Sequence, residues 1–125
     1  MSSELKITEP GRVAFGEEAY DLFEFDRCVD FHYKVQYEAA GPRVECALTL
    51  SREDGFVLQL HLEGVTHLRI PDLSPAFWIS ELQVIDVRHS QLEGVRYAVQ
   101  SEDGFACNCR NVRFGERGPG GTEAR

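Results

Sequence analysis

Two cysteines, Cys107 and Cys109, stand one residue apart in the stretch SEDGFACNCR, in a chain with only four cysteines. Thiolates bind zinc and take part in redox reactions, so this pair is the first candidate for chemistry. Structural zinc sites usually space paired cysteines by two to four residues on a tight turn, and redox pairs use CxxC at a helix start. The CxC spacing fits neither arrangement.

The residues around the pair favour packing in a hydrophobic core instead. On a strand, residues i and i+2 share a face, so Phe105, Cys107 and Cys109 point the same way. Cys46 likewise alternates with valine and leucine in the stretch RVECALTLS. Free cysteine behaves as a small hydrophobic side chain. We therefore predict that Cys46, Cys107 and Cys109 are buried, reduced and without metal, and leave Cys28 open.

Other signs of catalysis are lacking in the sequence. No G-x-S-x-G, G-x-G-x-x-G or P-loop pattern occurs. The histidines fall mainly on polar strand positions, where solvated or rim side chains are expected; they are His32, His61, His67 and His89. We predict no catalytic residues, no metal and no cofactor, and expect that the protein is not an enzyme.

Charge supplies the main hint about partners. The formal net charge is −8, which argues against nucleic-acid phosphates and anionic membranes and suits a basic protein partner. The densest run of carboxylates has three interpretations: a solvated acidic edge, a partner-binding patch, or paired catalytic carboxylates. We predict the second, with these residues binding the partner: Glu17, Glu18, Asp21, Glu24, Asp26 and Asp30.

A period of two dominates the elements that position these residues. Apolar and polar side chains alternate over 31–38, 43–51 and 55–64, as in half-buried antiparallel strands. Short turn sequences connect them, so the segment 31–62 is predicted to be a three-stranded meander. Three tyrosines share apolar strand faces and are expected in the core: Tyr33, Tyr37 and Tyr97.

The remaining segments predict further strands and few helices. Strands are expected over 65–70, 95–100 and 105–114, and one long strand over 78–89 with a bulge near Val84. The corner 71–77 is predicted to contain one helical turn, and 17–25 suits either a short helix or a strand.

These elements predict an all-β fold, an antiparallel β-sandwich or small barrel of about eight or nine strands. A length of 125 residues fits a single domain, which we place at 1–114. The glycine-rich segment 115–125 is predicted to be a disordered tail. The N-terminus has no apolar signal region and no run suits a membrane helix, so a cytoplasmic location is expected.

Part of the chain, from about Leu58 to Phe114, resembles the immunity protein 50 type of small bacterial β-domain. The resemblance lies in LQLHLEGVTHLRIPDL, ISELQVIDVR and VRYAVQSEDGFACNCRNVRF. The matching positions are Gly64, Val65, Leu68, Ile70, Leu82, Gly104, Cys109 and Val112. The resemblance implies a small protein that neutralises a partner toxin, and it carries no catalytic residues.

The hypothesis favoured by the sequence is a non-catalytic protein-binding module, an immunity-like protein that neutralises a basic toxin domain in bacteria. The alternatives are a small-molecule-binding sandwich or barrel, an accessory protein, and an enzyme whose site is assembled across strands.

Overall fold

The computed structural model describes residues 5–9, 11–70, 77–87 and 95–119, and these form three antiparallel sheets. The one helix among them is a single 3₁₀ turn, η1 (Leu22–Glu24). The predicted all-β fold is therefore confirmed, with more strands than the eight or nine expected and no closed barrel.

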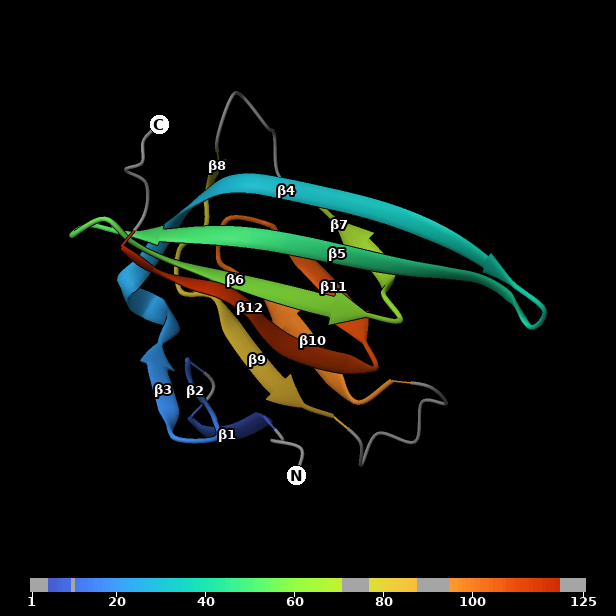
Figure 1. The fold of residues 1–125 in the computed structure, drawn as a ribbon, viewed down its shortest axis with the longest axis horizontal. Coiled ribbons are helices and arrows are strands. Elements are labelled where there is room, and N and C mark those ends of the chain that lie inside the picture. Colours follow the sequence, from blue (N-terminus) through green and yellow to red (C-terminus); the bar gives the residue numbers. More distant parts are fainter. Residues whose placement is uncertain (1–4, 10, 71–76, 88–94, 120–125) are drawn as a thin grey trace.

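The largest sheet has five strands and contains the longest elements of the chain (Figure 1). In order across the sheet, it consists of β12 (Asn111–Pro119), β6 (Phe56–Glu63), β5 (Gly41–Arg52), β4 (Phe25–Glu38) and β8 (Phe77–Trp78). The strands β4, β5 and β6 follow one another in sequence and form the predicted meander.

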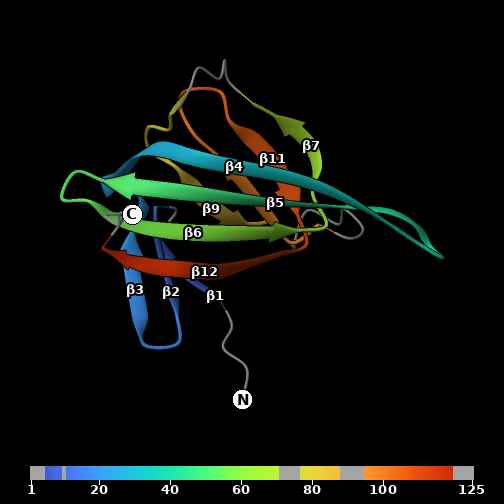
Figure 2. The ribbon, with the colours of Figure 1, turned by 45° about the horizontal axis from the view of Figure 1, so that its top comes forward.

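A four-stranded sheet lies behind the largest one in Figures 1 and 2. Its order is β7 (Thr66–Arg69), β11 (Ala106–Cys109), β10 (Tyr97–Gln100) and β9 (Gln83–Asp86). The side chains between the two sheets form one hydrophobic core, because alternate residues of each strand turn inward. The largest of them include Tyr97, Phe105, Leu48, Leu50, Leu58, Leu60 and Leu62.

The N-terminal segment forms a third, three-stranded sheet of β1 (Leu5–Glu9), β2 (Arg12–Phe15) and β3 (Glu18–Asp21). Aromatic rings join it to the largest sheet. The rings of Phe15 and Tyr20 each lie 5.3 Å from that of Phe114 on β12. The ambiguous segment 17–25 is thus a strand followed by the 3₁₀ turn and the start of β4.

Strand β4 carries two irregularities in its pairing with β5. The register shifts between Phe25 and Arg27 and again between Cys28 and Asp30, so one extra residue, Asp26 and then Val29, stands in β4 at each place. Such β-bulges let the apolar residues keep one face although they are spaced by three. Phe25 and Cys28 are buried and Phe31 is partly buried on the same core.

The β4–β5 hairpin extends beyond the rest of the molecule (Figures 1 and 2). Strand β6 ends at Glu63, which pairs with Glu45, and Val44 still accepts a backbone hydrogen bond of 3.0 Å from Val65. The β5 residues before Val44 pair with β4 alone. We call residues 34–45 the arm. Tyr37 on the arm is 83% exposed and Tyr33 at its base is 55% exposed, so the prediction that both are core residues was wrong.

Two other predictions differ from the structure. Instead of one strand over 78–89, β8 and β9 lie in different sheets, with a turn around Ser80 and Glu81 between them, and the β9–β10 register passes Val84 without a bulge. Strand β12 continues to Pro119, past the predicted domain end at residue 114, because it pairs with β6 as far as Phe56. Residues 71–76, 88–94 and 120–125 lie outside the described part of the chain.

Candidate functional site

The four cysteines lie inside the sandwich, which confirms the predicted burial of three of them. Burial raises the pKa of Cys28 and Cys46 to about 11 and that of Cys109 to about 12, and it also raises the pKa of Cys107. A thiol with so high a pKa is a poor nucleophile near neutral pH. Among the described residues, no group of His, Cys, Asp and Glu is arranged to hold a metal ion.

The predicted partner-binding carboxylates are spread over the β2–β3 turn, β3, η1 and β4, and most have partners within the chain. Glu18 accepts a hydrogen bond of 2.8 Å from Arg117, which lowers the pKa of this carboxyl. Asp21 accepts from the backbone N–H of Phe23 at 3.1 Å and so caps η1. Asp30 lies 3.0 Å from His32.

The structure brings two of the six, Glu24 and Asp26, into one hollow of about 620 Å³. The turn between β5 and β6 closes its other side. We call this surface the acidic end; it is lined by Phe23, Glu24, Asp26, Arg52, Glu53 and Asp54. Its four carboxylates and one guanidinium leave a local formal charge of −3.

Arg52 organises the acidic end. Two of its nitrogens donate to Asp54 at 2.9 Å, and a third contact reaches Glu24 at 3.4 Å. These bonds lower the pKa of Asp54, so its carboxylate stays charged well into acid. The guanidinium also covers the rings of Phe25 and Phe56, with centroids at 5.4 and 4.7 Å.

An exposed aromatic ring, Phe23, borders these carboxylates. Its side chain is part of η1 and is 44% exposed. The ring lies against Gly11, where an added Cβ would fall 2.4 Å from a ring carbon. The absence of a side chain at Gly11 therefore leaves room for the Phe23 ring beside the acidic end. Phe23, Glu53 and Asp54 were not predicted as site residues. The signal for Glu53 and Asp54 was the stretch REDG (52–55), one of the short turn sequences between the predicted strands.

A second hollow lies under the arm, at the opposite end of β4 and β5. Two adjoining cavities of about 740 and 610 Å³ share Val44, Val65, Thr66 and His67. The larger is apolar, and we call it the groove. Its lining comes from the two sheets: Phe31, Tyr33 and Val44 from the largest sheet, and Val65, Thr66, His67, Leu68 and Ile70 from β7 and its ends.

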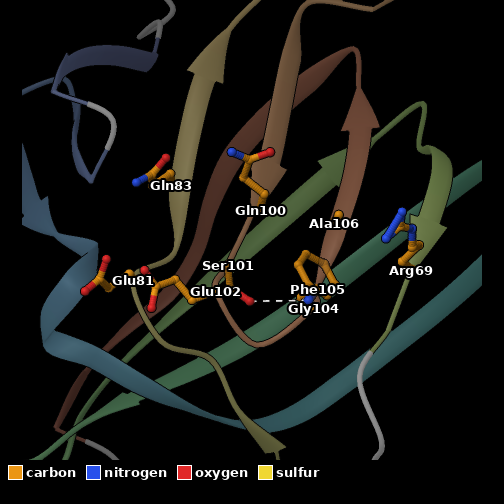
Figure 3. A pocket seen from close by; sticks show the side chains of 9 residues that line it. All are labelled: Arg69, Glu81, Gln83, Gln100, Ser101, Glu102, Gly104, Phe105 and Ala106. Atoms are coloured by element: carbon orange, nitrogen blue, oxygen red, sulfur yellow. Dashed lines mark hydrogen bonds between the residues drawn. The ribbon is translucent and has the colours of Figure 1, made fainter.

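A third, polar hollow of about 240 Å³ lies on the four-stranded sheet (Figure 3). Gln83, Gln100, Ala106 and Arg69 stand opposite one another across its four strands and form a row. The turn before β11 closes one side. In this turn the Ser101 hydroxyl oxygen accepts a hydrogen bond from the backbone N–H of Phe105. The row is polar and shallow, and it brings no nucleophile next to a general base.

No protein-family model, no curated protein and no solved structure matches the chain. Within the described residues, no helix is both long enough and apolar enough to cross a membrane.

Proposed function

We propose that the protein is a non-catalytic protein-binding module whose acidic end docks a basic partner. The single observation that supports this most is the exposed Phe23 ring beside four carboxylates. Protein interfaces commonly combine an aromatic anchor with charges that complement the partner. Charges at the rim of such a surface speed association with a partner of opposite sign.

The finer proposal is that the partner is a toxin domain that this chain neutralises, as the resemblance to immunity proteins implies. The net charge of −8 and the absence of catalytic sequence motifs support it. Of the six carboxylates predicted to bind the partner, the proposal uses Glu24 and Asp26 directly. Glu17, Glu18, Asp21 and Asp30 stay a prediction.

A binding titration tests the proposal. The partner is captured from the native host, purified, and titrated with the full chain at low and high salt. Reversing Glu24 and Glu53 to lysine (E24K/E53K) is expected to weaken binding at least tenfold at low salt and to reduce its salt dependence. Reversing Glu102 and Glu116 makes the same change in net charge at two exposed carboxylates that belong neither to the lining of the acidic end nor to the arm, and is the matched control.

If the partner binds E24K/E53K and the control variant with equal affinity, the acidic end is not the interface. The toxin proposal has its own test, because co-expression of the chain with the captured partner should restore growth of cells that the partner alone kills. Binding without restored growth would leave a binding module with another role.

A second candidate function is binding of an apolar small molecule. The groove of about 740 Å³ favours it, because it is lined mainly by aliphatic and aromatic side chains. Saturable, stoichiometric binding of an apolar fluorescent probe, lost on replacing Leu68 by Arg, is the expected result for this function.

A further inference from the structure

We propose that two copies of this chain form a dimer in which β4 of one copy pairs antiparallel with β4 of the other. In this dimer the arm of each copy lies against the groove of the other. The proposal concerns a surface distinct from the acidic end and does not depend on the proposed function. It rests on the open edge of β4, the exposed apolar face of the arm, and the groove at its base.

The edge of β4 is open over its outer half. On the side away from β5, β8 pairs only with Arg27 and Cys28, and in the described part of the chain no strand pairs there with residues 32–38. Unpaired backbone N–H and C=O groups along a long, exposed edge are a template for another strand. Two identical edges related by a two-fold axis pair antiparallel.

Only the base of the arm is supported by its own chain, where Glu45 pairs with Glu63 and Val44 accepts a backbone hydrogen bond from Val65. Beyond that base the arm is a two-stranded ribbon, and such a ribbon is marginally stable in water unless an apolar face is covered. The apolar face continues onto the arm through Val35 and Tyr37, and Tyr37 is the most exposed of the large hydrophobic side chains described. A partner that covers this face would stabilise the arm.

The groove supplies a place for Tyr37 of the second copy. It lies between β7, an edge strand of the four-stranded sheet, and the part of β4 beyond its short pairing with β8, and Phe31, Tyr33, Leu68 and Ile70 line it. A strand added beside β4 would turn alternate side chains into this space. Each copy therefore has an exposed aromatic side chain on its arm and an apolar cavity at the base of that arm.

Charge and geometry select the register. Pairing centred on Val35 sets Tyr37 opposite Tyr33 of the second copy, over its groove. It also sets Glu38 opposite His32 and Lys34 opposite Gln36, so no like charges meet.

Neighbouring registers are less favourable. Centring on Lys34 sets two lysines opposite each other and Asp30 opposite Glu38. Centring on Tyr33 brings Glu38 to Cys28, where β8 already pairs. Centring on Gln36 pairs Lys34 with Glu38 but moves Tyr37 beyond the groove.

Sedimentation equilibrium of the full chain over a range of concentrations tests the association. The expected result is a monomer–dimer equilibrium, with the dissociation constant raised at least tenfold by Tyr37→Ser, because buried aromatic anchors dominate interface energetics. Phe23→Ser also removes an exposed ring, but at the acidic end, and should leave the dissociation constant unchanged. A monomer at every concentration, or equal effects of the two variants, would overturn the proposal.

Cross-linking tests the register. Val35→Cys should form a covalent dimer on mild oxidation, because residue 35 of one copy faces residue 35 of the other. Arg43→Cys lies on β5 of the same arm, away from the paired edge, and should stay monomeric. The native cysteines are buried and do not compete. If Arg43→Cys cross-links as fast as Val35→Cys, the proposed pairing of the two β4 strands is contradicted.

The two proposals fail separately. Loss of dimerisation in Tyr37→Ser with unchanged partner binding would support the dimer and leave the acidic end intact as the partner surface. Loss of partner binding in E24K/E53K with an unchanged dimer would support the proposed function alone.

Discussion

Strands β4 and β5 run through two environments, the body of the sandwich and the arm. Both parts have the same alternation of apolar and polar residues, but the outcome differs. Leu48 and Leu50 in the body are fully buried, whereas Tyr37, on the matching face of the arm, is 83% exposed. The difference comes from the four-stranded sheet, which covers the face only in the body (Figure 2).

Alternation thus shows that one face of a strand is apolar, but not that its own chain covers that face. In the body, each inward side chain meets another across the sandwich and loses its contact with water. In the arm, the same pattern leaves the Tyr37 side chain in contact with water. The proposed dimer would cover this exposed apolar face.

The largest expected contrast between the two regions is in stability. Leu48→Ala should lower the free energy of unfolding by about 2–5 kcal/mol, because it leaves a cavity in a close-packed core. Tyr37→Ala, measured at concentrations where the chain is monomeric, should lower it by no more than about 0.5 kcal/mol. Denaturant titrations followed by circular dichroism measure both values. Similar losses for the two variants would mean that the arm is packed in solution.

A smaller effect is expected at the cysteines of the body. Cys109→Ser should destabilise the protein by about 1–3 kcal/mol, because it buries a hydroxyl without an assured partner. Cys109→Ala is the matched control, since it removes the sulfur but adds no polar atom. If serine is no worse than alanine under the same denaturant titration, the hydroxyl finds a partner and the site is less apolar than the structure indicates.

The smallest effect is expected from alkaline pH. The pKa values of Cys28 and Cys46 are about 11 in the fold, above that of a free thiol, so the unfolded chain loses its thiol protons first. The stability due to each neutral thiol is complete below about pH 8.5 and is lost as pH rises toward 11, by about 1 kcal/mol per thiol near pH 9. Denaturation midpoints between pH 8 and 10 measure this loss.

The alanine variant Cys46→Ala is the control for the pH experiment. Its midpoint should fall less steeply with pH than that of the wild type. Equal slopes would show that other groups cause the alkaline loss.

The fold was predictable from the sequence where strands pair with their neighbours in the chain. The meander over 31–62 follows from alternation and short turns, because both are local properties. The split between β8 and β9 was not predictable in this way. Trp78, Leu82 and Val84 have the spacing of one interrupted strand, and nothing local shows that Glu81 adopts a φ of 53° and that the chain changes sheets there.

The candidate site was only partly predictable, because it depends on contacts distant in sequence. Glu24 belongs to the predicted acidic run, but its ion pair with Arg52 spans 28 residues. Glu53 and Asp54 lie next to Arg52, in a turn that hairpin chemistry alone explains. Their meeting with Phe23 appears only when η1 and the β5–β6 turn are placed side by side.

The two bulges of β4 determine where this strand tolerates a change in length. Asp26 and Val29 have no partner on β5, so deleting either one would turn a bulge into a regular ladder and leave Phe25, Cys28 and Phe31 facing inward. Deleting His32 would instead send the residues on one side of it to the opposite face. Related chains can therefore lose one residue at a bulge and keep the fold, whereas the same loss three residues after the second bulge would exchange the inward and outward faces of part of the strand.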